Sequence, residues 1–302
     1  MSRPRRFLPS ISLLCAFEAV LRTGSTAAAA RELDLTQGTV SRLVQNLEAQ
    51  LGLRLFERHR QRLIPGAAAR AYGRDISRAL DLIQRAGLQL AANPGGGTLA
   101  LAILPAFGTR WLAPRLGAFQ AAHPGVTLSI ATRLQRFNFA AEGFDAAIHF
   151  GAEDWRDAGH LKLLDETLTV CAAPGFLAGR ARIARVEDLA TLPLLQLGTR
   201  PGAWAAWSAG QGAAPLVARG MLFDQFAPLI EAAIAGLGIA VLPDFLADPE
   251  IEAGRLVPVL ARAVPSGGAY WLVWPRAREN YPPLAAFRAW LGAEIARDAA
   301  RR

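Results

Sequence analysis

The sequence predicts a protein of two unequal parts: a small, mainly helical N-terminal module and a larger C-terminal α/β domain, joined by a long helix. The chain has 302 residues, more than one ordinary core accommodates. Helical periodicity dominates residues 13–92, whereas strand-like and helical segments alternate after residue 97. Between the two parts, residues 93–97 read Asn-Pro-Gly-Gly-Gly, which ends a helix and marks the domain boundary.

Positive charge is concentrated at the start of the chain. Residues 1–74 contain 12 arginines against 5 acidic residues, whereas the remaining residues are nearly balanced. Codon bias explains arginine in place of lysine, since Lys162 is the only lysine, but it does not explain the asymmetry. A concentrated basic surface attracts polyanions, so the N-terminal module is expected to bind one.

Composition and cysteine content narrow the class of protein. With 52% hydrophobic and 19% charged residues, the chain is expected to fold throughout. Two cysteines, Cys15 and Cys171, are too few for a disulfide framework or a zinc cluster. Residues 1–20 resemble a secretion signal in charge, but Glu18 interrupts the apolar stretch. No apolar run approaches the ~20 residues that span a bilayer, so we expect a cytoplasmic protein without a membrane partner.

The first two helices of the module follow from periodicity and capping. The apolar stripe of the first helix has the spacing i, i+4, i+7 and i+8, at Leu13, Phe17, Val20 and Leu21. Gly24 ends this helix, and Ser25 caps a short second helix through Leu33. Asp34 and Leu35 then form a turn.

A third helix begins after Thr36, which can cap it. Its inner side is predicted to hold Val40, Leu43, Val44 and Leu47. Its outer side carries amide, hydroxyl and guanidinium groups, from Gln37, Thr39, Ser41, Arg42 and Gln45. Such groups read base edges in the major groove or hold phosphates, although a polar helix face can also be merely solvated.

The neighbouring segments favour the first interpretation. A short helix, a tight turn and a polar-faced helix form a helix-turn-helix, in which the second helix enters the groove. Leu53, Leu55 and Phe56 then precede three arginines with period-two spacing, Arg58, Arg60 and Arg62. We expect a small hairpin whose arginines share one face of an extended segment and contact phosphate or the minor groove, as a wing does.

The stretch AARELDLTQGTVSRLVQNLEAQLGLRLFER, within Phe17 to Arg58, closely resembles the N-terminal domain of LysR-type transcriptional regulators. The resemblance implies that residues 36–47 form the recognition helix, with DNA contacts from Gln37, Thr39, Ser41, Arg42 and Gln45. One departure follows the wing. Where the family commonly has Thr-Glu-Ala-Gly, this chain has Ile-Pro-Gly-Ala at residues 64–67, which leaves the entry to the next helix open.

The connecting helix, residues 67–92, carries apolar side chains spaced alternately by four and three residues. They are Tyr72, Ile76, Ala79, Ile83, Ala86 and Leu90. This spacing predicts a coiled-coil seam between two chains, although a single helix packed on its own domain is the alternative. The expected domains are a winged helix-turn-helix at 1–66, a linker and dimerisation helix at 67–94, and a regulatory domain at 95–302.

The C-terminal part alternates strand-like runs with helical patterns. The runs are residues 98–104, 126–132, 146–150, 168–173, 239–242 and 269–274. This alternation predicts an α/β fold with largely parallel sheets, in which ligands lie beyond the carboxyl ends of strands.

Four segments of this part also resemble the LysR-type effector domain, a two-lobed fold similar to periplasmic binding proteins. They are RWLAPRLGAFQAAHPGVTL, FDAAIHFG, AAIAGLGIAVLP and GRLVPVL. Together with Trp204, Trp207 and the late segment AFRAWL, they look most like the branch of activators of glycine cleavage and of β-lactamase expression. The expected lobes are about 98–168 with 268–302, and 169–267.

Loops at strand ends are the candidate effector site, although each residue could instead serve packing. The candidates are Pro105, Ala106, Phe107, Thr132, Arg133, Thr199, Arg200, Phe223, Asp224 and Phe226. Members of the branch often have Ser where this chain has Ala106, which cannot donate a hydroxyl hydrogen bond. His149 stands where Arg is common, and on its own such a histidine is more often structural.

Two other functional classes compete with a regulator. An enzyme lacks support, because no paired-carboxylate motif, phosphate-binding glycine loop or metal-ligand cluster occurs in the sequence. A solute-binding protein would explain the C-terminal fold but not the basic module. We therefore expect no catalytic residues, cofactor or metal. The expected partners are double-stranded operator DNA, a small-molecule effector, a second copy of the chain in a dimer or tetramer, and RNA polymerase if the protein activates.

Overall fold

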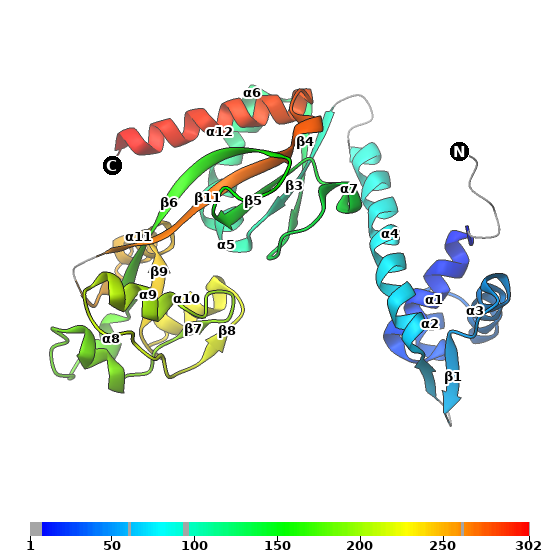
Figure 1. Ribbon diagram of the computed structural model, residues 1–302, viewed down its shortest axis with the longest axis horizontal. Coiled ribbons are helices and arrows are strands. Elements are labelled where there is room, and N and C mark those ends of the chain that lie inside the picture. The colour runs from blue at the N-terminus through cyan, green and yellow to red at the C-terminus, as the bar shows by residue number, and fades with distance from the viewer. Residues whose placement is uncertain (1–7, 60–61, 93–96, 261–262, 302) are drawn as a thin grey trace. The chain divides into compact units, whose positions relative to one another are not determined.

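The computed structural model describes residues 8–59, 62–92, 97–260 and 263–301 (Figure 1). The chain divides into two compact units, Met1–Pro94 and Gly95–Arg302. Each unit has its own hydrophobic core.

The N-terminal unit is three helices, a hairpin and a long helix. Its elements are α1 Ile11–Thr23, α2 Thr26–Glu32, α3 Gln37–Leu51, β1 Phe56–His59, β2 Arg62–Pro65 and α4 Ala67–Ala92. The expected caps are confirmed: Ser25 Oγ accepts from the Ala28 amide, and Thr36 Oγ1 accepts from the Thr39 amide. Gly24 ends α1 in the left-handed conformation, at φ 68°, which costs glycine little.

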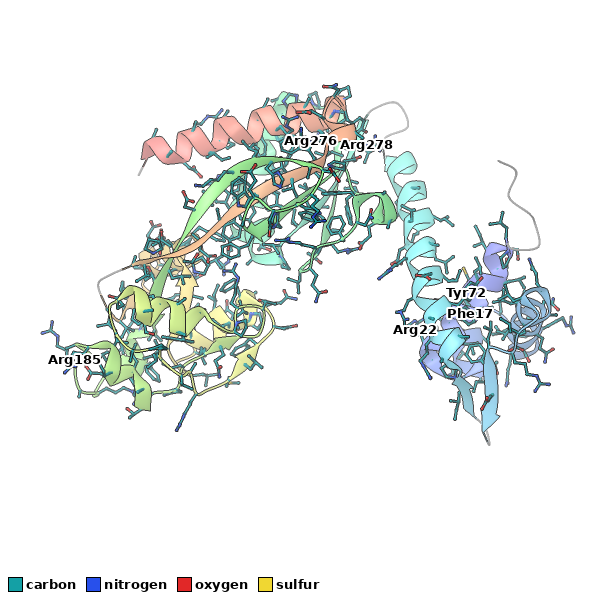
Figure 2. All side chains as sticks on the ribbon, viewed as in Figure 1. Phe17, Arg22, Tyr72, Arg185, Arg276 and Arg278 are labelled. Atoms are coloured by element: carbon teal, nitrogen blue, oxygen red, sulfur yellow. The ribbon has the colours of Figure 1, made fainter. Side chains whose placement is uncertain are left out.

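Phe17 is the centre of the N-terminal core. Its ring lies 5.7 Å from that of Phe56 in the hairpin and 5.5 Å from that of Tyr72 in α4, and Figure 2 shows Phe17 and Tyr72 together. A Cβ at Gly73 would lie 2.0 Å from the Leu21 side chain, so glycine allows α4 to approach α1 closely. The first half of α4 therefore belongs to this core.

The hairpin differs from its expected form. β1 ends at His59 and β2 begins at Arg62, with these two residues paired across the hairpin. Arg58 and Arg62 therefore lie on different strands, and Arg60 lies outside the described residues. The expectation that all three arginines share one extended segment is wrong, because the chain reverses between them.

The C-terminal unit contains a seven-stranded sheet and a two-stranded one (Figure 1). The strands are β3 Gly97–Ile103, β4 Val126–Thr132, β5 Ala146–Gly151, β6 Ala158–Ala172, β7 Gln196–Leu197, β8 Leu222–Phe223, β9 Ala240–Pro243, β10 Val257–Pro258 and β11 Val264–Pro275. The helices are α5 Pro105–Phe107, α6 Leu116–Ala122, α7 Phe139–Glu142, α8 Pro174–Leu177, α9 Ala203–Gly210, α10 Phe226–Ile234, α11 Asp244–Glu252 and α12 Pro282–Arg301. A π-helix, Gly108–Leu112, continues α5, and 3-10 turns lie at Ala113–Arg115, Val186–Thr191 and Arg276–Arg278.

The large sheet is mixed, so the expectation of largely parallel sheets is wrong. β3 pairs in parallel with β4 and β5, but β11 pairs antiparallel with β5 and β6, as do β9 and β10 with β6. The cause is that β6 and β11 run side by side in opposite directions as a long ribbon. Antiparallel neighbours need no crossover helix between them.

The ribbon of β6 and β11 contributes residues to two lobes, and each lobe has a hydrophobic core of its own. Leu163 and Tyr270 belong to the core that contains Phe119, whereas Leu168 and Val264 belong to the core that contains Trp207. The boundaries between the lobes were expected after residues 168 and 267. The first of these positions lies within β6 and the second within β11. Both strands thus pass from one lobe to the other.

Among the residues that the structure describes, none of the helices is both long and apolar enough to cross a bilayer.

The carboxylate of Glu48 joins α3 to the hairpin, because its Oε1 accepts from the amides of Leu55 at 2.7 Å and Phe56 at 3.1 Å. We predict that Glu48→Ala destabilises the N-terminal unit by about 1–3 kcal/mol, since two amides lose their acceptor. Hydrogen exchange of the full chain measures this locally, as faster exchange in α3 and β1. The control Glu57→Ala, at an exposed position on β1, should change stability by less than about 0.5 kcal/mol. Equal effects of the two substitutions would contradict the assignment.

Candidate functional site

The outer face of α3 is the first candidate site. Val40, Val44 and Leu47 are 0%, 6% and 0% exposed, so they fix the inner side of the helix. On the other side Gln37, Thr39, Arg42 and Gln45 are exposed, and Ser41 is half-buried. The N-terminal unit therefore presents the expected polar side chains to solvent.

The residues of this face differ in whether their side chains form hydrogen bonds within the unit. Thr36 and Thr39 share a hydroxyl hydrogen bond of 2.8 Å, and Gln37 Nε2 donates to Thr26 Oγ1 at 3.2 Å. Arg42 and Gln45 make no hydrogen bond or ion pair with another described residue. The start of α3 is thus ordered by contacts within the unit, while its middle offers unpaired donors.

The hairpin places backbone beside this helix but adds few defined side chains. Arg58 lies on β1 and Arg62 on β2, and their side chains, like all of Arg60, are outside the described part. Contacts from these three arginines stay a prediction.

The second half of α4 exposes apolar side chains. Tyr72 and Ile76 pack on the N-terminal core, as the single-helix alternative requires. Farther along, Ile83 is 50% and Leu88 62% exposed. Ala79 and Ala86 are also exposed, and the Leu90 side chain is outside the described part. The seam is therefore divided, with its first part buried within the unit and its second part uncovered.

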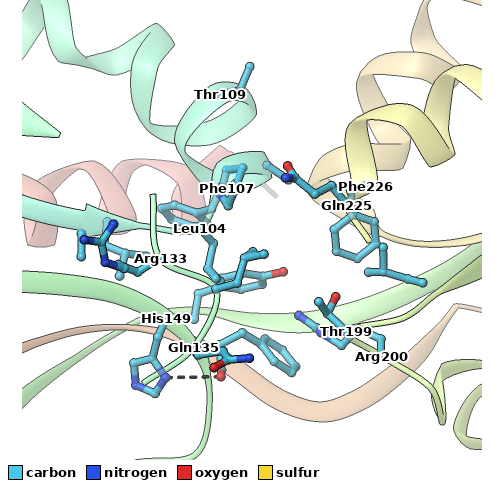
Figure 3. A pocket seen from close by; sticks show the side chains of 18 of the residues that line it. Leu104, Phe107, Thr109, Arg133, Gln135, His149, Thr199, Arg200, Gln225 and Phe226 are labelled. Atoms are coloured by element: carbon cyan, nitrogen blue, oxygen red, sulfur yellow. Dashed lines mark hydrogen bonds between the residues drawn. The ribbon is translucent and has the colours of Figure 1, made fainter. Parts of the chain in front are cut away.

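A cavity of about 540 Å³ in the C-terminal unit is the second candidate site (Figure 3). Its walls come from α5, the π-helix, the loop after β4, β5, the loop after β7 and the start of α10. Eight of the expected effector residues line it: Pro105, Ala106, Phe107, Arg133, Thr199, Arg200, Asp224 and Phe226. Strand-end loops distant in sequence therefore meet at one cavity, as α/β folds generally arrange.

Two of the expected residues are not in the lining. Thr132, the last residue of β4, is exposed, and its carbonyl accepts from Arg133 Nη1 at 2.8 Å. Phe223, in β8, packs partly buried against the core of the second lobe. Strand geometry explains both cases, since the side chain of a strand's last residue can point away from the site that its loop builds.

The lining also includes residues that sequence reasoning missed: Thr109, Arg110, Gln135, Arg136, Trp155, Gln225 and Tyr270. Thr109 lies two residues after the expected Phe107, and Gln225 lies between the expected Asp224 and Phe226, so a wider window around each loop would have found them. Tyr270 comes from β11, and no local signal in the sequence connects that strand with the cavity.

A buried carboxylate organises one wall. Glu166, fully buried on β6, accepts from Arg200 Nη1 at 2.7 Å and from the Tyr270 hydroxyl at 2.8 Å. Burial, and then the nearby Glu166 charge, raise the pKa of Tyr270 far above its usual range, so it stays a neutral donor. The Arg200 guanidinium also lies 3.4 Å from the Phe150 ring centroid, which fixes it against the first lobe.

The other three arginines of the lining are also paired with carboxylates. Arg110 lies 2.9 Å from Glu250, which is fully buried in α11. Arg133 Nε donates to Glu142 at 2.6 Å, and Arg136 Nη2 donates to Asp154 at 2.5 Å. None of these carboxylates is in the lining of the cavity.

His149 is buried at the edge of the cavity. Its Nδ1 lies 3.3 Å from the Phe150 carbonyl oxygen, which can only accept, so Nδ1 carries the proton. Burial is the main cause that lowers the pKa of His149, which keeps the imidazole neutral. Its ring meets Trp155 edge-on at 5.0 Å. His149 thus combines the structural role expected of it with a place in the lining.

Family models match both units of the chain. The model described as the bacterial regulatory helix-turn-helix protein, lysR family, matches residues 11–70, and that described as the LysR substrate binding domain matches residues 92–296. The chain is 33% identical over 292 residues to the glycine cleavage system transcriptional activator of Escherichia coli K12, covering 96% of this chain and 95% of that protein. It is also 33% identical to the transcriptional activator AmpR of Rhodobacter capsulatus, covering 98% and 100%.

Experimental structures agree with these matches. The effector domain of AmpR from Pseudomonas aeruginosa is 32% identical, with a TM-score of 0.61 over 68% of this chain and 98% of that one. CrgA from Neisseria meningitidis, a LysR-type transcriptional regulator, is 25% identical with a TM-score of 0.60, covering 95% and 99%. Full-length CbnR in complex with its target DNA has a TM-score of 0.71 at 22% identity, over 94% and 99%, and thus shares the fold.

We predict that Arg200→Ala destabilises the C-terminal unit by about 3 kcal/mol, because the Glu166 carboxylate is left buried without a cation. Arg185, labelled in Figure 2, is a matched control, since it pairs with Glu187 at the surface with both side chains more than half exposed. Its substitution by alanine should cost no more than about 0.5 kcal/mol. Thermal unfolding of the two variants measures the difference, and similar midpoints would refute a central role for the Glu166 pair.

Proposed function

Since the chain belongs to the LysR-type transcriptional regulators, we propose that it reads operator DNA with the outer face of α3 and senses a small molecule in the cavity of its C-terminal unit. The family comprises transcriptional regulators with a helix-turn-helix domain and a substrate-binding domain, and this chain has both. The observation that carries the proposal is the two-sidedness of α3: aliphatic side chains fill the core while amide, hydroxyl and guanidinium groups face solvent.

The proposed DNA contacts divide into two kinds. We propose that Arg42 and Gln45, which have no partner among the described residues, contact base edges in the major groove. We propose that the residues at the start of α3, Ser41 and the three arginines of residues 58–62 contact phosphates, which position the protein without reading sequence. The second kind comprises Thr36, Gln37, Thr39, Ser41, Arg58, Arg60 and Arg62.

The effector is proposed to contact the eight expected residues that line the cavity, with Gln225, His149 and Tyr270 added. A molecule there touches both lobes, because Phe107 comes from the first lobe and Phe226 from the second. Its affinity can therefore differ between arrangements of the lobes, which is the condition for coupling to DNA binding. We assign residues 95–302 to this regulatory domain, 1–66 to the DNA-binding domain and 67–94 to the linker.

Self-association is proposed to run through the second half of α4. The exposed seam residues Ala79, Ile83 and Ala86 would be covered by a second chain, and a dimer would present two recognition helices to half-sites about one turn of DNA apart. We further propose that the protein works in the cytoplasm, carries out no catalysis and contacts RNA polymerase where it activates.

The test of DNA binding is its salt dependence. Footprinting on genomic DNA fragments that the protein retains locates an operator, and fluorescence anisotropy then follows affinity as salt rises. A regulator that holds phosphates should lose affinity steeply, by about 10³-fold or more between low and moderate salt. Weak binding with no preference for the footprinted segment would reject the proposal.

We predict that Arg42→Ala weakens operator binding by about 1–3 kcal/mol, because an unpaired guanidinium on the groove-facing side is lost. Arg185→Ala, which removes the same charge from the other unit, is the control and should bind as the parent does. Anisotropy with the operator fragment provides the measurement. An unchanged affinity for Arg42→Ala would remove this residue from the contact set.

We predict that Ile83→Asp dissociates the oligomer, because a charge at a seam position cannot be buried between chains. Gln84→Asp adds the same charge at the adjacent exposed position, off the seam, and should leave assembly intact. Sedimentation velocity distinguishes the two variants. The seam would be excluded if both sedimented as the parent does.

A further inference from the structure

The charges around the cavity indicate which class of effector it accepts, an inference that rests on the proposed function of this cavity. We propose that the effector carries a protonated amino group on a mainly apolar body, and that Asp224 accepts the amino group. Small organic anions of similar size are then bound more weakly.

The first observation is that the arginines of the lining have their charge compensated. Arg110, Arg133, Arg136 and Arg200 are the cationic residues of the lining, and each is paired with a carboxylate at 2.5–2.9 Å. An incoming anion therefore competes with an existing partner of opposite charge at every arginine. Glu250 is shared with Arg255, which lies outside the lining and is half exposed, so water screens that additional charge.

The second observation is the position of Asp224. It is the one carboxylate among the described residues of the lining, it is exposed, and it makes no ion pair or hydrogen bond within the described part of the chain. His149 is neutral, so it does not compensate this charge. An unpaired carboxylate at the edge of a cavity attracts a cation and repels an anion.

The first amides of a helix carry partial positive charge, which by itself favours an anion at the start of α10. Here Asp224 precedes the N-cap residue Gln225, so a carboxylate already lies at that end of the helix. The partial charge of the helix is thus offset before any ligand arrives.

The remaining walls fit an apolar body. Phe107, Phe226, Leu197 and Ile230 line the cavity, and Ala106 offers no hydroxyl group to a polar ligand. The volume of about 540 Å³ is in the range of small-molecule sites. Among the polar groups of the described lining Asp224 carries the one negative charge, so recognition of a cation is concentrated at its edge of the cavity.

Isothermal titration calorimetry of the full chain near neutral pH and at low salt tests the proposal with two probes of matched size, 2-phenylethylamine and 3-phenylpropanoate. The amine should bind at least about tenfold more tightly than the carboxylate. Asp224→Asn should weaken the amine by about tenfold and leave the carboxylate equal or tighter. Glu231→Gln removes an equal charge from an exposed position of α10 outside the lining, and should leave amine binding unchanged.

The proposal is overturned if the carboxylate binds as tightly as the amine, if Asp224→Asn binds the amine as the parent does, or if neither probe binds at millimolar concentration. Salt-dependent operator binding, measured on the same preparation, separates these outcomes from failure of the proposed function. If operator binding is retained while one of these three outcomes occurs, the proposed class of effector is rejected and the proposed DNA-binding function is not.

Discussion

The arrangement of the regulatory domain around its cavity depends on the hydrogen bonds that the buried carboxylate of Glu166 accepts. Glu166 lies on β6, near the point where the ribbon passes from one lobe to the other, and accepts from Tyr270 on the other strand of that ribbon. Its second oxygen holds Arg200, which comes from the second lobe and lies over Phe150 of the first. A single buried side chain therefore links the two strands of the ribbon with the loop after β7 that lines the cavity.

Similar pairs recur around the cavity, where each arginine of the lining is paired with a carboxylate that is not itself in the lining. Pairing of this kind orders long side chains, because a guanidinium held at one edge loses much of its rotamer freedom before a ligand arrives. It also removes most of the net charge that four arginines would place in the cleft. Selectivity for charge then depends on Asp224, the charged residue of the lining that has no partner in the part of the chain that the structure describes.

The sequence predicted local structure well and long-range arrangement less well. Caps at Ser25 and Thr36, and the sidedness of α3, follow from spacing and side-chain chemistry within a few turns of helix, so they could be found without a structure. The turn of the hairpin between His59 and Arg62 could not, because period-two spacing continues across a reversal of the chain. The antiparallel ribbon and the place of Tyr270 in the cavity depend on pairing between strands about a hundred residues apart, which periodicity does not encode.

Arginine content illustrates why composition alone cannot assign a role to a charge. Arg42 and Arg200 are the same residue type, yet Arg42 faces solvent without a partner among the described residues, whereas Arg200 lies between a buried carboxylate and an aromatic ring. An unpaired guanidinium can form new bonds to phosphate or to a base, while one that is already paired mainly supports the structure around it. The basic excess of the first 74 residues therefore indicates binding to a polyanion, because acidic partners are scarce there. The larger number of arginines in the regulatory domain does not, because carboxylates accompany them.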